Sequence, residues 1–167
     1  MKRFLIGVLL LAAHTASAQD IYNKGKAQLA ARDTAGAFSS FQDAVKANQK
    51  IAESNHYLGA ISFARRKYDD AIGYLQASYK ADDDNIDVIK TLGKAFLEKK
   101  DDKNALNWLR LAAKVAPKDC EVSVIFGQAL VAADSMDPAI VQLTRAKECM
   151  PENPAIYLSL GDAYFKI

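Results

Sequence analysis

Five glycines at one fixed spacing constrain the fold more than any other feature of this 167-residue chain. They stand 34 residues apart, at Gly25, Gly59, Gly93, Gly127 and Gly161. Other positions keep the same period, namely small residues at Ala37, Ala71, Ala105 and Ala139 and large apolar residues at Phe41, Leu75, Leu109 and Leu143. No insertion breaks the register. A period of this length predicts a repeat architecture in which each unit buries its apolar face against its neighbours.

Each period is typical of two helices joined by a short turn. In the second period, residues 52–64 carry apolar side chains at helical spacing, and Ala71 and Leu75 mark one face of a following helix. The polar segment 65–70 separates the two helices, and Asp82–Asn85 supplies N-cap residue types before the next period. A glycine inside a helix costs about 1 kcal/mol relative to alanine. We therefore infer that Gly59 is retained because the two helices of its unit approach each other closely.

The periodic positions resemble the tetratricopeptide repeat. The residues that match its motif best are Leu92, Gly93, Phe96, Ala105, Leu109, Ala112 and Pro117, followed by Gly127, Leu130, Ala139, Leu143, Ala146 and Pro151. The first unit departs most, with Lys24 and Gln28 at usually apolar positions. The resemblance covers about residues 19–167 and implies an all-α, right-handed superhelical solenoid. Its expected repeats are residues 18–51, 52–85, 86–119 and 120–153, with the first helix of a fifth repeat over 154–167.

The N-terminus has the pattern of a secretory signal peptide. Lys2 and Arg3 precede an uninterrupted apolar stretch over residues 4–13, and Ala16 and Ala18 are the small residues of a cleavage site. The stretch is too short to span a bilayer, so an uncleaved anchor is the weaker alternative. We expect residues 1–18 to be removed near Ala18, and the mature chain to be exported to the periplasm or secreted. A bacterial source is favoured, while a eukaryotic secretory protein remains open.

The charge balance argues against nucleic acid as a partner. The chain has 22 basic and 20 acidic residues, and removal of Lys2 and Arg3 makes the two numbers equal. Nucleic-acid binding depends on a basic surface that neutralises phosphates. We also expect no membrane span in the mature chain, because no further apolar run is long enough.

No sequence pattern supports catalysis, a cofactor or a metal. With His14 in the signal peptide, His56 is the single histidine of the mature chain, and no phosphate-binding loop is present. The acidic segment Asp82–Asp87 lacks the glycine and the distal glutamate of an EF-hand loop. Two cysteines without paired histidines do not make a zinc site. We therefore expect a protein that is not an enzyme.

The two cysteines stand at the start and the end of the fourth repeat. Antiparallel helices joined by a short turn bring Cys120 close to Cys149. In an oxidising compartment this arrangement predicts a disulfide. Two separate buried thiols are the alternative.

The resemblance implies that the first helix of each repeat lines a concave groove that binds a protein or peptide. The groove positions of this sequence are Tyr22, Lys26, Leu29, His56, Phe63, Lys90, Lys94, Leu97, Val124, Gln128 and Val131. Leu29, Phe63, Leu97, Val131 and Phe165 form an apolar stripe with one residue per repeat, which either binds a partner or packs neighbouring helices. Next to the three lysines, this stripe suits a segment that carries acidic groups.

These patterns predict a non-catalytic protein-interaction scaffold in the cell envelope. The alternative is an N-terminal structural arm of a longer envelope protein whose activity lies beyond residue 167. The fifth unit bears on this choice, because Leu158, Phe165 and Ile167 leave it without a polar outer face. We expect either a partner that covers these residues or, preferably, further repeats or a further domain.

Overall fold

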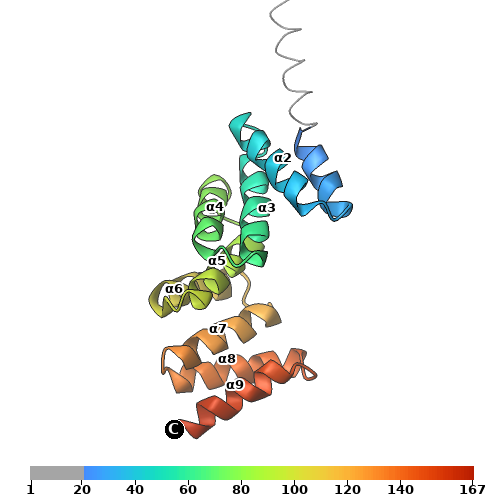
Figure 1. Cartoon of the computed structure of the whole chain (residues 1–167). Coiled ribbons are helices and arrows are strands. Elements are labelled where there is room, and N and C mark those ends of the chain that lie inside the picture. The colour runs from blue at the N-terminus through green and yellow to red at the C-terminus, as the bar shows by residue number, and fades with distance from the viewer. Residues whose placement is uncertain (1–20) are drawn as a thin grey trace, which may run out of the picture. The chain divides into compact units, whose positions relative to one another are not determined.

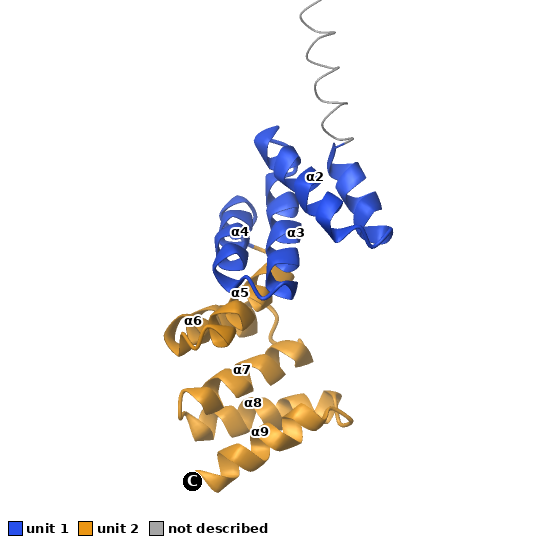
Figure 2. Cartoon of the chain, viewed as in Figure 1, with its two compact units in different colours: residues 1–83 blue, residues 84–167 orange. Residues whose placement is uncertain are grey.

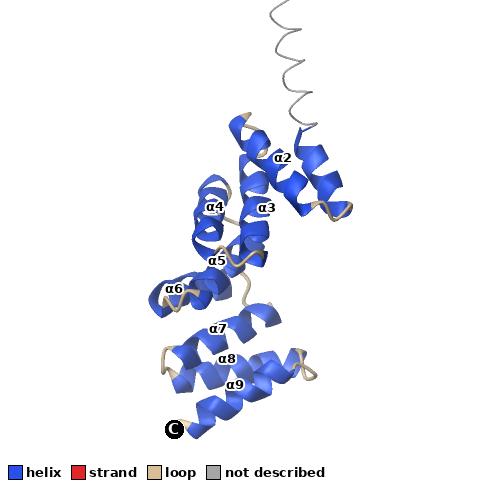
Figure 3. Ribbon diagram, in the orientation of Figure 1, coloured by secondary structure: helices blue, strands red, loops and turns tan. Residues whose placement is uncertain are grey.

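The computed structural model describes residues 21–167, in which every regular element is a helix (Figures 1 and 3). The predicted signal peptide, residues 1–18, lies outside the described residues. A helical segment over residues 21–30 is followed by α2 (Thr34–Lys46), α3 (Ile51–Ala64), α4 (Tyr68–Ala81), α5 (Ile86–Glu98), α6 (Asp102–Val115), α7 (Cys120–Ala132), α8 (Met136–Cys149) and α9 (Pro154–Phe165). The expectation of an all-α helical repeat solenoid is confirmed. Among the helices over 21–167, none combines the length and hydropathy needed to cross a membrane.

The described part of the chain divides into two compact units, which contain residues 21–83 and 84–167 (Figure 2). The first unit packs around Phe41, Ala44 and Leu58, which are at most 1% exposed. In the second unit, helices α7, α8 and α9 meet in a core cluster around Leu143, Ala146 and Ile156, and a further cluster lies around Leu109, Ile125 and Ala129. In both units the periodic small and large apolar residues are buried in the core. The 34-residue period of the sequence is therefore also the period of the packed structure.

The close approach inferred for Gly59 is confirmed by the packing around the glycines. A Cβ atom built on Gly59 would lie 2.5 Å from Cγ of Leu75, the large periodic residue of α4. At Gly93 and Gly127 the corresponding distance to the leucine of the second helix is 2.6 Å. Real side chains do not approach this closely, so only glycine permits this separation between the two helices of a repeat.

Aspartate and asparagine side chains start most of the helices. Asp33, Asp101 and Asp119 each accept a hydrogen bond from a backbone N–H in the first turn of α2, α6 and α7. Asn85, in the segment expected to contain caps, accepts hydrogen bonds from the backbone N–H groups of Asp87 and Val88. These caps satisfy N–H groups that have no partner within the helix.

The turn within each repeat contains a residue in the left-handed conformation. The φ angle is 62° at Arg32, 60° at Arg66, 58° at Lys100 and 52° at Asp134, and these positions keep the 34-residue period. The next backbone N–H bonds five residues back, as in Asp101 N to Phe96 O, at 2.9 Å. This is the hydrogen bond of a Schellman motif, which usually has glycine at the left-handed position. Four non-glycine residues therefore accept an unfavourable backbone conformation so that the second helix can turn back on the first.

Candidate protein-binding surface

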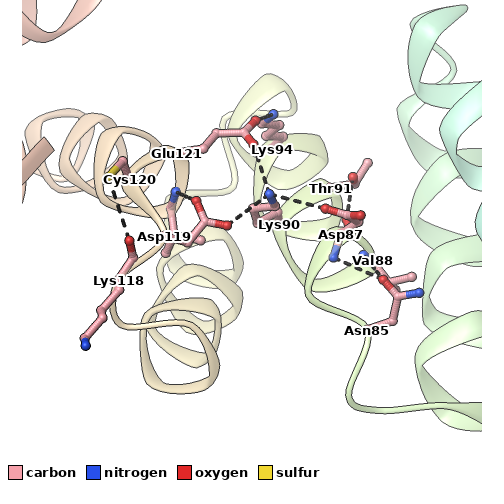
Figure 4. Close-up of polar contacts among 11 residues, drawn as sticks. Asn85, Asp87, Val88, Lys90, Thr91, Lys94, Lys118, Asp119, Cys120 and Glu121 are labelled. Atoms are coloured by element: carbon pink, nitrogen blue, oxygen red, sulfur yellow. Dashed lines mark hydrogen bonds and ion pairs between the residues drawn. The ribbon is translucent and has the colours of Figure 1, made fainter. Parts of the chain in front are cut away.

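In the second unit, ion pairs join the first helices of two successive repeats, α5 and α7 (Figure 4). Nζ of Lys90 on α5 lies 2.9 Å from Oε2 of Glu121 on α7. Lys94, one turn further along α5, donates to the other carboxylate oxygen of Glu121. The structure therefore places the predicted groove residues Lys90 and Lys94 on the side of α5 that faces the start of α7.

Lys90 is the centre of this polar cluster. Its ammonium also lies 3.2 Å from Asp119 and 3.3 Å from Asp87, and its side chain is only 12% exposed. Burial alone would lower the pKa of Lys90, but its hydrogen bonds to Glu121, Asp119 and Asp87 outweigh burial and raise the pKa above the usual value. Lys90 therefore stays charged, and its charge is satisfied within the protein.

Glu121 is the partner that both lysines share. Hydrogen bonds from Lys94 and then from Lys90 lower the pKa of this carboxyl, against a smaller opposing effect of burial. The cluster contains two ammonium groups and three carboxylates, which gives a net charge of −1. Because Lys90 and Lys94 are engaged with these carboxylates, an acidic partner would have to displace Glu121 to reach them.

The apolar groove residues of the second unit contribute to packing between helices. Val124 is 6% exposed and lies in the cluster that contains Ile156 and Leu160 of α9. Val131 is partly buried against the same cluster, and Leu97 is partly buried against Ile125 and its neighbours. Packing of neighbouring helices, the alternative kept open for this stripe, therefore accounts for part of its apolar character.

Gln128 is the polar residue among the predicted groove residues of α7, and it is partly exposed. It follows Glu121 by seven residues and Val124 by four, so these side chains share one face of α7. The polar cluster and Gln128 together make a surface along α5 and α7.

In the first unit, aromatic rings surround the predicted groove residues. Tyr22 is 9% exposed, and its ring centroid lies 5.8 Å from that of Phe41 and 6.3 Å from that of Tyr57. Burial, followed by the neighbouring Tyr57, raises the pKa of Tyr22. The ammonium of Lys26 lies 5.9 Å from the centre of the Tyr22 ring, a cation–π contact.

The other three groove residues of this unit also contact apolar groups. His56 lies against the ring of Tyr57, with centroids 5.9 Å apart, and Phe63 lies 5.7 Å from the ring of Tyr68. Leu29 is partly buried against the core of the unit. This part of the predicted groove is therefore an aromatic and apolar surface, with Lys26 as its exposed cation.

The two cysteines meet at the open end of the α7–α8 pair. Their Cα atoms are 6.3 Å apart, and a disulfide joins Cys120 and Cys149. A Cα separation in this range is what a disulfide requires. Among residues 21–167, no group of three or more histidine, cysteine, aspartate or glutamate side chains is placed to hold a metal ion.

The acidic partners of the lysines were missed by reasoning from the sequence. Neither Asp119 nor Glu121 is singled out there, yet Asp119 caps α7 and also accepts a hydrogen bond from Lys90. The signal that could have found them is periodic, because Glu121 follows Asp87 by one repeat length, at the position of the first helix that faces the preceding repeat. Charged residues at equivalent positions of neighbouring repeats are candidates for ion pairs across the repeat interface.

Comparisons with known proteins identify the repeat. Two family models described as tetratricopeptide repeat match residues 22–86 and 62–123, so together they cover the chain from residue 22 to residue 123. No match was found among curated protein sequences.

Several solved structures have the same fold. YrrB, described as a TPR protein with an unusual peptide-binding site, is 19% identical, with a TM-score of 0.81 over 92% of this chain and 82% of that one. A MamA protein is 20% identical, with a TM-score of 0.82 over 89% of this chain and 81% of that one. The first TPR of Spaghetti (RPAP3), bound to the HSP90 peptide SRMEEVD, is 22% identical, with a TM-score of 0.66 over 68% of this chain and 90% of that one. The chain belongs to the tetratricopeptide repeat family.

Proposed function

We propose that this protein is a non-catalytic scaffold that binds a segment of a partner protein along the first helices of its repeats. The observation that carries the proposal is the arrangement of α5 and α7. Ion pairs from Lys90 and Lys94 to Glu121 hold these two helices side by side, so that Gln128 and the polar cluster form one surface. Tetratricopeptide repeat proteins are generally scaffolds. Of the similar structures, YrrB is described as having a peptide-binding site and the first TPR of Spaghetti is bound to a peptide.

The chemistry of this surface favours a partner segment with a basic or neutral group beside α5 and α7. The cluster around Lys90 has one more carboxylate than ammonium group. A lysine or arginine of the partner would neutralise this excess, whereas an added carboxylate would be repelled. From the sequence alone, a partner segment with acidic groups is expected. The ion pairs of Lys90 and Lys94 with carboxylates of the protein itself are the reason that we now propose a basic or neutral one.

In the first unit the proposed surface is aromatic. Tyr22, Tyr57 and His56 lie in one row of ring contacts, and the exposed Lys26 lies over the ring of Tyr22, which is itself nearly buried. Aromatic side chains provide large contact area at low cost in conformational entropy and are enriched at protein interfaces. A segment with apolar side chains suits this part.

The cell envelope is part of the proposal and rests on the N-terminal sequence. Lys2, Arg3, the apolar stretch over 4–13 and the small residues before residue 19 support an exported protein. Intact mass of the protein isolated from its own cells tests this. A chain that begins at Gln19 agrees with the proposal, and a chain that retains residues 1–18 contradicts it.

Site-specific photocrosslinking in living cells tests the binding surface. A photoreactive amino acid is placed at Gln128 on α7 and, as the matched control, at Asn107, an exposed residue of α6 in the same unit. We expect one partner protein to be crosslinked from Gln128 and not from Asn107. Equal crosslinking from both positions, or a partner captured only from Asn107, contradicts the proposed surface.

A further inference from the structure

A cavity of about 440 Å³ lies at the disulfide end of the α7–α8 pair. This volume is in the range of small-molecule sites. Its lining residues fall between 117 and 149, in the loop before α7, the first turn of α7 and the end of α8, so α9 is not part of it. Its charged, hydroxyl and sulfur-bearing side chains are those of Lys118, Cys120, Ser123, Arg145, Glu148 and Cys149.

The disulfide joins two walls of this cavity. Cys120 is the first residue of α7 and Cys149 is the last residue of α8, so the bond between them holds the start of one helix against the end of the other. Ser123 follows Cys120 by about one turn, and Arg145 precedes Cys149 by about one turn. The positions of Ser123 and Arg145 are therefore fixed by the disulfide and by the packing of α7 on α8.

Ser123 has a hydroxyl group that borders the cavity and has no partner in the protein. The residue is only 4% exposed, and its hydroxyl makes no hydrogen bond to any other residue in the described part of the chain. Burial of a hydroxyl without a hydrogen bond is unfavourable, and buried polar groups in folded proteins normally have a partner. A ligand in the cavity that accepts a hydrogen bond from Ser123 would provide this partner.

Three charged side chains of the cavity have no ion-pair partner among residues 21–167. They are Lys118 in the loop before α7 and Arg145 and Glu148 on α8, and all three are exposed. Arg145 and Glu148 are three residues apart on one helix, a spacing at which opposite charges can pair, yet they form no ion pair. In Figure 4 the side chain of Lys118 points away from the polar cluster around Lys90. The cavity therefore presents two unpaired cations and one unpaired anion.

A ligand with the opposite set of charges complements these groups. The planar guanidinium of Arg145 suits a carboxylate, with which it can form two parallel hydrogen bonds. Lys118 suits a second carboxylate, and Glu148 suits an ammonium group. The hydroxyl of Ser123 can donate a hydrogen bond to a carboxylate oxygen. The complementary set is two carboxylates and one ammonium group, which are the charges of a free acidic amino acid.

We propose that this cavity binds a free acidic amino acid, glutamate or aspartate. The two carboxylates of the ligand lie next to Arg145 and Lys118, and its ammonium group lies next to Glu148. Neither Gln128 nor any residue of the polar cluster around Lys90 lines the cavity. The site is therefore distinct from the surface along α5 and α7, and it would operate whether or not that surface binds a partner segment.

Titration of the purified, isotope-labelled chain with L-glutamate, followed by NMR, tests the binding. The backbone amide signal of Ser123 should shift saturably, with a dissociation constant on the order of 1 mM. Glutarate, which lacks the ammonium group, and glutamine, which lacks one carboxylate, are the control ligands. Each should bind about fivefold more weakly, because each loses one exposed ion pair.

Three substitutions of exposed side chains identify the groups that bind the ligand. Glu148→Gln should remove the preference for glutamate over glutarate, because the partner of the ammonium group is lost. Arg145→Gln should weaken glutamate binding about fivefold. Lys147→Gln is the matched control, since it removes the same charge from the same helix at a residue that does not line the cavity. It should leave the affinity unchanged at physiological ionic strength, and circular dichroism verifies that all variants are folded.

Three results would overturn the proposal. The signal of Ser123 could show no saturable shift at glutamate concentrations well above the expected dissociation constant. Glutamate, glutamine and glutarate could bind equally, which would leave only adventitious binding of anions. Arg145→Gln and Lys147→Gln could weaken binding to the same extent, which would show that the net charge of α8, rather than the cavity, attracts the ligand.

Discussion

Leucine at two periodic glycines of the second unit should have opposite effects on stability. At Gly127 the new Cβ would lie 2.6 Å from Cγ and 2.7 Å from Cδ2 of Leu143, a fully buried side chain, and 3.4 Å from the backbone nitrogen of Leu143. Leu143 has no room to withdraw, so α7 and α8 must separate. At Gly161 no heavy atom lies within 4 Å of the new Cβ.

The magnitudes follow from two opposing effects. Overpacking a core costs about 3 kcal/mol at the upper end of its usual range. Replacing glycine by leucine inside a helix gains about 1 kcal/mol in helix propensity. Gly127→Leu should therefore lower the free energy of unfolding by about 2 kcal/mol. Gly161→Leu should raise it by up to about 1 kcal/mol, because only the propensity changes.

Urea unfolding followed by far-UV circular dichroism measures both variants against the unaltered chain. Fluorescence of Trp108, on α6 of the same unit, provides a second signal. The reasoning is refuted if both substitutions shift the unfolding midpoint in the same direction. That result would mean that the glycines are not retained for the approach of the second helix.

The other predictions concern the polar cluster, the cysteines and the turns. Because the pKa of Glu121 is lowered in the folded state, its ion pairs stabilise the fold at pH values above the ordinary glutamate pKa of about 4.3, and this stabilisation is lost as the pH falls through the lower folded-state pKa. Because the pKa of Lys90 is raised, its contribution is present below about pH 10 and is lost only at higher pH. When the pH is lowered from 7 to 3, the free energy of unfolding of the unaltered chain should therefore fall by up to about 1 kcal/mol more than that of Glu121→Gln, as measured by urea unfolding. An equal fall in both proteins would contradict the role of this carboxyl. Closing the 29-residue separation between Cys120 and Cys149 should stabilise the oxidised protein by about 3–4 kcal/mol relative to the reduced one, and two reactive thiols in the unreduced, denatured protein would contradict the bond. Lys100→Gly removes the steric cost of a left-handed backbone at φ 58° and should stabilise the chain by about 0.5–1 kcal/mol. Lys99→Gly, at φ −82°, is the control and should not stabilise it. Equal effects of the two substitutions would contradict the view that the left-handed conformation is unfavourable at Lys100.

The fold could be predicted from the sequence because its period is carried by core residues. Gly59, Ala71 and Leu75 form the contact between the two helices of their repeat, so the spacing of these residues in the sequence indicates that contact. The left-handed turns could not be predicted in this way. The backbone conformation is the same at Arg32, Arg66, Lys100 and Asp134, but none of these side chains is the glycine that usually marks such a turn.

The candidate surface was predictable only in part. The positions that line the first helices follow from the repeat register, so Lys90, Lys94 and Gln128 could be assigned to it. Their electrostatic character could not, because it depends on Asp119 and Glu121 at the start of α7, which reach back to α5. The apolar outer face of the fifth unit was also predictable, and Leu158, Phe165 and Ile167 are exposed in the structure.

Binding of the crosslinked partner segment to three forms of the purified chain tests the central claim most directly. The forms are the unaltered chain, Gln128→Trp on α7 and the matched Asn107→Trp on α6. The bulky ring at Gln128 should obstruct the proposed surface and weaken binding at least about tenfold in titration calorimetry. Asn107→Trp should leave the affinity unchanged. Equal affinities for all three forms, with helicity retained, would show that the partner does not bind along the first helices of the repeats.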